Sequence, residues 1–242
     1  MKDNFITNNL FAQIPSILEP IFDELKTPLS VIADIENWLW KIANDPPLGF
    51  KKYDDGIIIG KGVTIEAGAT ILPPAVICSG AEIRQGAYIR GYAFIGEGAV
   101  VGHATEVKKS ILMPYAKAPH FNYLGNSILG YKAHLGAGVI LSNLKADKSD
   151  IVIHGEEDFP TGMRKLGALV GDEAEIGCNA VLNPGSVIGK RAVVYPLVSF
   201  RGVLPEGYIA KSADITVKRG LTEGKIFSKE SHYKSIRQGK PL

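Results

Sequence analysis

An aliphatic residue or methionine recurs at every sixth position between Ile59 and Met113. A six-residue period fits neither a helix of 3.6 residues per turn nor an array of hairpins with turns every 8–12 residues. It is typical of a parallel β-helix, in which three hexads, each a short strand plus a bend, close a triangular coil of about 18 residues. We therefore predict an all-β fold of stacked coils. The run comprises Ile59, Ile65, Ile71, Ile77, Ile83, Ile89, Ile95, Val101, Val107 and Met113.

Small residues and glycines follow the same period. A small residue stands four positions after most of the aliphatic ones, and glycine often follows the aliphatic residue directly, as in Ile95-Gly96. Glycine makes up 27 of 242 residues, about 11% against a typical ~7%. We expect the aliphatic side chain to point into the prism, the small residue to fit its corner, and glycine to give the turn its backbone freedom. The period returns at Leu129, Leu135, Leu141, Val170, Ile176, Leu182, Ile188, Val194 and Phe200.

The chain divides into three parts by this pattern. Residues 1–55 show two amphipathic helical patterns and are predicted to form a helical cap over the open end of the prism. Residues 56–210 form the β-helix, with loop excursions expected at about 114–123, which holds two prolines, and at 142–165, which is polar and irregular and can form a short hairpin. Residues 211–242 are a basic tail or last helix, solvated or contributing to an anionic ligand.

Composition excludes several classes of protein. Lys and Arg number 27 and Asp and Glu 25, so the formal charge of +2 argues against a nucleic-acid binder. No apolar run approaches the roughly 18–20 residues of a membrane span, and no secretory signal is visible, so we expect a cytoplasmic protein without membrane contact. Cys78 and Cys178 lie far apart, which predicts two small packed residues rather than a disulfide or a zinc finger.

The 18-residue coil also predicts which residues stack. Arg90 and Lys108 are one coil apart, which places one about 4.8 Å above the other. Two stacked cations repel each other, so the pair indicates an anion held by both, and phosphate is the natural candidate. The alternative is that both are surface cations paired with Glu97 and Glu106.

His120 is the histidine best placed for chemistry, because it follows a proline where the period breaks. A neutral imidazole with a pKa of ~6.5 can take a proton at physiological pH. A structural or surface role remains the alternative for each of the five histidines. No two of them stand at a short, ligand-like spacing, and no metal is expected.

Three stretches carry a resemblance to a known family. They are Glu106-Val107-Lys108-Lys109, His120-Phe121-Asn122-Tyr123-Leu124-Gly125, and Leu135-Gly136-Ala137-Gly138 with Leu141-Ser142-Asn143. These resemble the left-handed β-helix acetyltransferase domain of bifunctional sugar-1-phosphate nucleotidylyltransferase/acetyltransferases, of the glucosamine-1-phosphate acetyltransferase/UDP-N-acetylglucosamine pyrophosphorylase type. The segment 162–172 resembles the archaeal branch. The resemblance covers about residues 57–210 and implies a left-handed β-helix.

The resemblance also implies roles. His120 would be the general base that deprotonates the sugar ammonium, and Arg90 and Lys108 would hold the sugar phosphate. Tyr123, His134 and Asn143 would contact the sugar, and a backbone N–H would stabilise the oxyanion. Looser matches place Lys148 and Lys165 at the cofactor. Acetyl-CoA would be the co-substrate, an amino-sugar phosphate the acceptor, and a homotrimer the assembly.

Two departures from the family qualify this expectation. The family commonly has Asn at the position of His134, which leaves the amino sugar and the acyl group open. No Gly-rich phosphate loop of the nucleotidylyltransferase half is present, so nucleotidylyl transfer is expected to be absent. The alternative function is a non-catalytic β-helix that binds a sugar nucleotide or regulates a separate nucleotidylyltransferase; a zinc-dependent β-helix carbonic anhydrase is a distant third.

Overall fold

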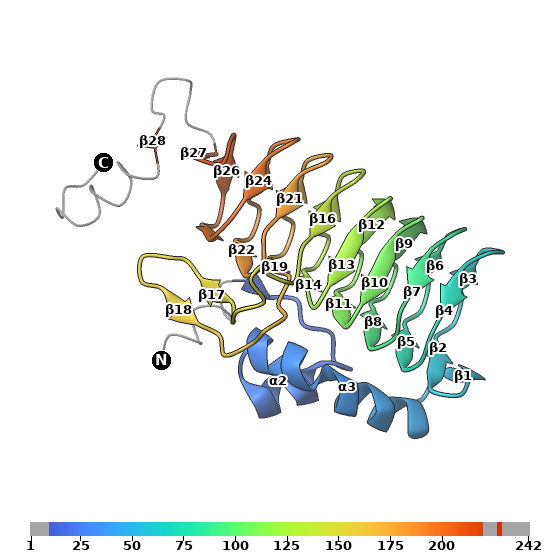
Figure 1. Cartoon of the computed structure of the whole chain (residues 1–242). Coiled ribbons are helices and arrows are strands. Elements are labelled where there is room, and N and C mark those ends of the chain that lie inside the picture. The colour runs from blue at the N-terminus through green and yellow to red at the C-terminus, as the bar shows by residue number, and fades with distance from the viewer. Residues whose placement is uncertain (1–9, 220–226, 229–242) are drawn as a thin grey trace.

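The chain winds into a three-sided prism of stacked coils (Figure 1). This computed structural model describes residues 10–219 and 227–228. Within each face, hydrogen bonds join each strand mostly to its parallel equivalents in the neighbouring coils, for example β2 to β5 and β5 to β8. The predicted fold class, an all-β left-handed parallel β-helix of hexapeptide repeats with N-terminal helices, is confirmed.

We name one face of the prism after the helices that cover it and the other two after their number of strands. The helix face contains β1 (Lys51–Asp54), β2 (Ile57–Ile59), β5 (Ala75–Ile77), β8 (Ala93–Ile95), β11 (Ser110–Leu112), β14 (Ile128–Leu129), β19 (Ala168–Val170), β22 (Ser186–Ile188) and β25 (Val203–Leu204). The seven-strand face contains β4 (Thr70–Ile71), β7 (Tyr88–Ile89), β10 (Glu106–Lys108), β13 (Tyr123–Gly125), β16 (Ile140–Leu141), β21 (Val181–Leu182) and β24 (Ser199–Phe200). The ten-strand face contains β3 (Thr64–Ile65), β6 (Glu82–Ile83), β9 (Val100–His103), β12 (Lys117–His120), β15 (His134–Leu135), β20 (Glu175–Ile176), β23 (Val193–Val194), β26 (Tyr208–Ala210), and the antiparallel β27 (Ile215–Lys218) and β28 (Phe227–Ser228).

The interior of the prism is a column of aliphatic side chains. Ile77, Ile83 and Ile89 are fully buried there, and alanines such as Ala81 and Ala87 occupy the positions next to the corners. Burying one such aliphatic side chain stabilises the fold by about 1.5–3 kcal/mol. The aliphatic residue of each six-residue repeat therefore becomes part of the core.

The period slips by one residue after Val107. Leu112, five positions later, points into the prism, whereas Met113 is buried in a second cluster outside it. The prediction that Met113 continues the inward column is therefore wrong. Leu112 pairs with Ile95 across 17 residues instead of 18, because the turn at Lys109 is one residue shorter than the turn below it.

Residues 114–123 do not loop out of the prism, contrary to the sequence-based expectation. They carry β12 and the first residue of β13, with Ala116 and Ala118 fully buried in the interior. Pro114 lies at a corner, where the fixed φ of proline is compatible with the turn. Pro114 therefore fits the turn at this corner, and the chain continues around the prism without an excursion.

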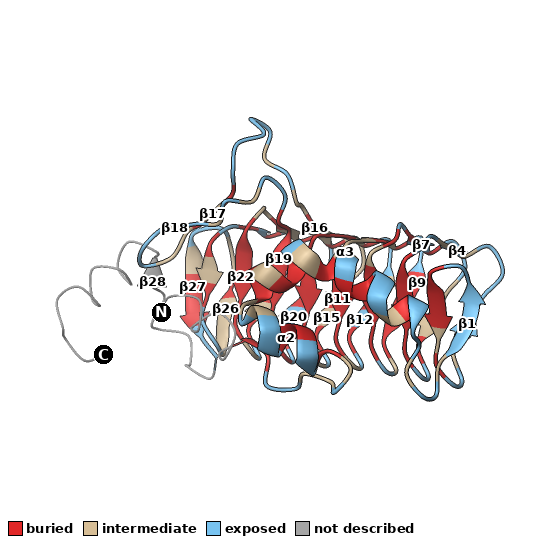
Figure 2. Cartoon of the chain, turned by 90° about the horizontal axis from the view of Figure 1, so that it is seen from below, coloured by how far each residue is buried: buried red, intermediate tan, exposed pale blue. Residues whose placement is uncertain are grey.

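The N-terminal helices α2 (Glu19–Leu25) and α3 (Pro28–Asn44) lie along the helix face rather than over the open end (Figures 1 and 2). The predicted position of the cap is corrected accordingly. The helices cover a second core, because this face also carries outward-pointing apolar residues. Trp38 packs on Phe94 with ring centroids 6.3 Å apart. The outward residues of this face are Ile58, Val76, Phe94, Ile111, Ile128, Leu169 and Val187.

One coil carries a long excursion. Leu129 pairs with Val170 across 41 residues, whereas the coil before it takes 17. The extra chain follows β16 and contains the antiparallel pair β17 (Val152–Ile153) and β18 (Phe159–Pro160). It leaves the prism at the corner between the seven-strand face and the helix face. Of the basic tail, most residues beyond 219 lie outside the described residues.

Candidate functional site

The predicted site residues map mainly onto the seven-strand face and its two corners. Glu106 pairs in register with Tyr88 below and Tyr123 above, so these three side chains form a row pointing outward from the middle of the face. The same register places Lys108 directly above Arg90, at the corner next to the helix face. The stacking predicted for this pair from its 18-residue spacing is therefore present.

The two stacked cations differ in their partners. Arg90 Nη1 donates to Glu106 Oε1 at 2.7 Å, and this hydrogen bond together with the charge of Glu106 raises the pKa of Arg90. Lys108 has no side-chain hydrogen bond or ion pair with any described residue. Glu97, the other acid weighed for this pair, instead accepts a hydrogen bond from Tyr115. The ion-paired alternative thus holds for Arg90 and leaves Lys108 available for an anion.

The side chains of Tyr123 and Asn143 meet above the backbone of Gly125. Tyr123 Oη donates to Asn143 Oδ1 at 3.5 Å, and Asn143 Nδ2 donates to Asn126 Oδ1 at 2.7 Å. A Cβ at Gly125 would lie 2.5 Å from Asn143 Nδ2 and 2.7 Å from Tyr123 Oη, so only glycine leaves room for both side chains. Burial, and then the charge of Glu106, raises the pKa of Tyr123, which keeps the phenol protonated and able to donate.

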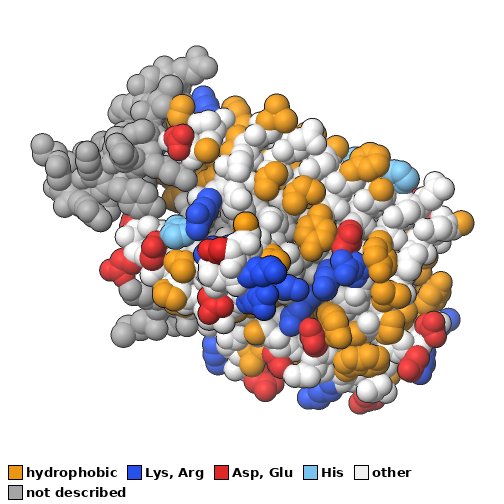
Figure 3. Space-filling view, in the orientation of Figure 1, with side chains coloured by type: hydrophobic (Ala, Val, Ile, Leu, Met, Phe, Trp, Pro, Cys, Tyr) orange, Lys and Arg blue, Asp and Glu red, His pale blue; other side chains and the backbone are white. Residues whose placement is uncertain are grey.

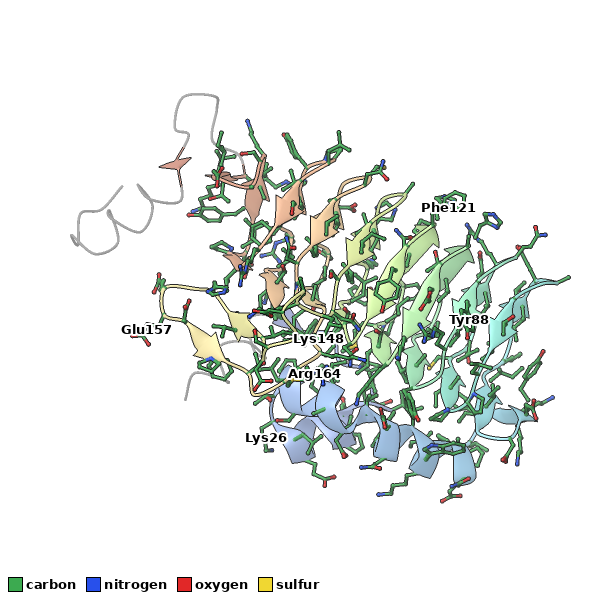
Figure 4. The ribbon with its side chains drawn as sticks, viewed as in Figure 1. Lys26, Tyr88, Phe121, Lys148, Glu157 and Arg164 are labelled. Carbon is green, nitrogen blue, oxygen red and sulfur yellow. The ribbon has the colours of Figure 1, made fainter. Side chains whose placement is uncertain are left out.

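His120 lies at the opposite corner of the same face, where β12 ends (Figure 4, near Phe121). It stacks on His103 in register and is exposed. Its backbone N–H donates to Asn122 Oδ1 at 3.1 Å, and no described residue hydrogen-bonds its imidazole. Five positions along the chain, including the bend at Phe121, separate His120 from Gly125, the register partner of Lys108. An acceptor that touches both must bridge the face.

Within one chain, His134 does not lie on the seven-strand face. It points outward from the ten-strand face, between Lys117 and Glu175 in register, and its Nδ1 lies 2.9 Å from Glu175 Oε2. Lys148 and Lys165 lie on the two limbs of the excursion and are exposed. Sequence reasoning missed three members of the neighbourhood, namely Gly125, Asn126 and Arg164. Gly125 lies inside a quoted motif, Asn126 follows that motif directly, and Arg164 lies inside the quoted segment 162–172, so the resemblance could have led to all three.

The remaining features limit the chemistry. No three His, Cys, Asp or Glu side chains in the described part of the chain are grouped to hold a metal ion. Across the described ranges, no helix has the length and apolarity needed to cross a membrane. Cys78 is buried, which raises the pKa of its thiol to about 12, whereas Cys178 is exposed and not packed as expected. The site therefore offers a base, cations and neutral hydrogen-bonding groups.

Comparisons with known proteins bear out the resemblance. Residues 56–91 match the family model described as bacterial transferase hexapeptide (six repeats). The chain is 35% identical over 96 residues to the bifunctional sugar-1-phosphate nucleotidylyltransferase/acetyltransferase of Sulfurisphaera tokodaii, covering 39% of this chain and 24% of that protein. It is 35% identical over 88 residues to the bifunctional protein GlmU of Methanocaldococcus jannaschii, covering 36% and 22%. The chain thus spans about a quarter of the length of these relatives.

Solved structures of similar fold are more distant. The UDP-N-acetylglucosamine acyltransferase from Campylobacter jejuni has 13% identity and a TM-score of 0.34, with 75% of this chain and 73% of that chain covered. The acetyltransferase domain of PglB from Neisseria gonorrhoeae in complex with acetyl coenzyme A has 15% identity and a TM-score of 0.24, with 62% and 52% covered.

Proposed function

We propose that the chain is an acyl-CoA-dependent N-acetyltransferase whose acceptor is an amino-sugar 1-phosphate. The observation that carries the proposal is the arrangement on the seven-strand face: a histidine at one corner, stacked Arg90 and Lys108 at the other, and Tyr123 with Asn143 between them. An amino sugar with a phosphate has matching chemistry, since it presents an amine, hydroxyls and an anion. The similarity to bifunctional acetyltransferases supports the same activity.

In this proposal His120 acts as the general base. Its neutral imidazole takes a proton from the sugar ammonium, and the amine then attacks the carbonyl carbon of the acetyl thioester. A new C–N bond forms, the C–S bond breaks, and the imidazolium gives its proton to the departing thiolate of CoA. The freed imidazole then takes the second proton from the acylated nitrogen and releases it to solvent, which leaves a neutral amide. Arg90 and Lys108 hold the phosphate, which fixes the distance from the amine to His120.

We also propose a homotrimer in which this face meets a second copy. Large apolar side chains are exposed along the face and its His120 corner: Tyr88 is 38% exposed, Phe121 58% and Leu197 78%. The chain's own helices already cover the helix face. Subunits would therefore meet through the other two faces, and His134 of one chain can approach the site of its neighbour.

Acetyl-CoA consumption against a panel of amino-sugar 1-phosphates tests the proposal. We expect turnover with at least one acceptor, and His120→Ala should lower kcat by about 10²–10⁴-fold, the usual contribution of a general base. His103→Ala is the matched control, because His103 lies one coil away in the same register and bonds Gln85 O. Full activity of His120→Ala would remove the base role; no activity with any acceptor and no CoA binding in calorimetry would favour the regulatory β-helix instead.

A further inference from the structure

The helix face of the prism ends in an exposed edge strand. β1 (Lys51–Asp54) is the outermost of the nine strands of this face, and β2 is the only described strand that pairs with it. All four residues of β1 are exposed. Figures 1 and 2 show β1 at the end of the prism opposite to β27. An edge strand presents unpaired backbone N–H and C=O groups, which can pair with a strand of another chain.

The interior of the prism is incompletely covered at the same end. Ile71, in the first strand of the seven-strand face, is only partly buried, whereas Phe200, in the last strand of that face, is 1% exposed. Two large apolar side chains near this end are exposed, namely Leu48, which precedes β1, and Leu72, which follows β4. An exposed apolar patch on a folded protein commonly marks an interaction site. The partly buried inward residues of the first coil are Ile59, Val63, Ile65, Ala69 and Ile71.

The charge along this edge changes sign at its centre. Lys51 and Lys52 precede Tyr53, and Asp54 and Asp55 follow it, so residues 51–55 are neutral as a whole. Figure 3 shows acidic and basic side chains beside one another at this end of the molecule. Lysines on an edge strand usually discourage pairing with another chain. Here the aspartates that follow make an antiparallel copy of the same strand the matching partner, because opposite charges across an antiparallel pair are stabilising and like charges are destabilising.

The charged side chains of this edge have few strong contacts within their own chain. Lys52 Nζ lies 3.0 Å from Asp55 Oδ1, but the two side chains are 62% and 84% exposed, and an exposed ion pair contributes little to stability. Lys51 makes no side-chain hydrogen bond or ion pair with any described residue. Tyr53, at the centre, has no register partner in β2. These side chains can therefore pair with a second copy at little cost to the fold of the first.

We propose that two copies of the chain pair antiparallel along β1, about a twofold axis perpendicular to the helix face. Lys51 then lies opposite Asp55 of the second copy and Lys52 opposite its Asp54, with the two Tyr53 side chains at the axis. The helix-face sheets of the two copies become continuous, and the open ends of the two prisms face each other.

This contact is compatible with the proposed trimer, because that trimer uses the other two faces of the prism. A threefold axis along the prism would leave all the β1 strands at one end of the trimer. Two trimers would then join end to end into a closed assembly with D3 symmetry. The inference does not depend on whether the chain transfers acetyl groups, since it concerns the end of the prism alone.

Light scattering coupled to gel filtration tests the inference through the molar mass of the assembly. We expect the wild-type protein to contain an even number of chains. Lys51→Asp/Lys52→Asp makes residues 51–55 negative apart from Tyr53, so it should halve the mass and raise the concentration for half-association about tenfold or more. Both side chains are exposed, so the fold should be retained, which circular dichroism checks.

The opposite charge reversal makes the experiment specific for a second copy. Asp54→Lys/Asp55→Lys should also halve the mass, whereas an equimolar mixture of the two variants places Lys opposite Asp throughout and should restore the wild-type mass. Asp23→Lys/Glu24→Lys is the matched control, because it reverses two exposed charges on α2 and should leave the mass unchanged. An odd number of chains in the wild-type assembly, an unchanged mass in both β1 variants, or a mixture that stays at half the mass would overturn the proposal.

Discussion

Glycine serves two separate purposes in the coils. Gly102 follows an inward residue and has no positive φ, but a Cβ there would overlap the backbone of Pro119 in the next coil. Gly62 has φ +71 with nothing within 4 Å of an added Cβ. The first kind permits close approach of coils, and only the second needs left-handed backbone freedom. The expectation that glycine beside the aliphatic residue supplies turn freedom is therefore wrong for the first kind.

We predict that Gly102→Ala destabilises the protein far more than Gly62→Ala. The first change forces backbone apart and should lower the free energy of unfolding by about 3 kcal/mol or more. The second costs only the left-handed conformation of alanine, about 1–2 kcal/mol. Urea unfolding of the two variants measures the difference, and equal losses would show that close approach does not limit the stacking of coils.

Asp172 fastens the N-terminal segment to the prism. It is 5% exposed, its Oδ2 accepts the N–H of Ala12 at 2.8 Å, and its Oδ1 accepts the N–H of Tyr131 at 2.9 Å. Burial raises the pKa of this carboxyl, and the N–H donors oppose the rise. The group therefore contributes most stability below its ordinary pKa and less as pH rises through the raised value.

Asp172→Asn should release this contact, because the amide keeps one acceptor oxygen in place of two. We expect the free energy of unfolding to fall by about 1–3 kcal/mol, the cost of an unsatisfied buried N–H. The loss relative to wild type should grow as pH falls from 7 toward 4, since the variant lacks the titrating group. Urea unfolding at both pH values measures it; a loss that shrinks toward acid pH would contradict the direction of the pKa shift.

At the scale of elements, the helices and the prism share one apolar layer. Phe94 is fully buried and points outward from β8 onto α3, where it meets Trp38. The strands of this face are thus apolar on both sides, which is typical of parallel sheets covered on both faces. On this face, the prism and the helices bury each other's apolar side chains.

Phe94→Ala should remove about 3–5 kcal/mol from the free energy of unfolding by leaving a cavity between helix and prism. Tyr195→Ala is the control, because Tyr195 is 40% exposed on the ten-strand side and should change stability by no more than about 0.5 kcal/mol. Thermal unfolding of both variants provides the comparison. If the two variants lost similar amounts of unfolding free energy, the apolar layer between the helices and the prism would not act as a core.

At the scale of the whole molecule, the coils bring together residues that are far apart in the chain. A 17- or 18-residue step places Arg90 under Lys108 and His103 under His120. The excursion leaves and re-enters the 41-residue coil at the same corner, which brings Lys148 and Arg164 toward the corner that Lys108 occupies 40 and 56 residues earlier in the chain. The face between the corners is therefore the natural surface for a ligand that contacts both.

The sequence by itself determined the coil, its inward column and the Arg90–Lys108 stack, because a fixed period converts spacing directly into position. It did not predict the slip after Val107 or the closed coil through Pro114, since one residue more or less at a corner costs little and leaves no clear trace in the pattern. Only the tertiary structure decided that the helices cover a flat face and that His134 points away from Tyr123. Those outcomes depend on which surfaces pack together, and amphipathic patterns specify an apolar face without naming its partner.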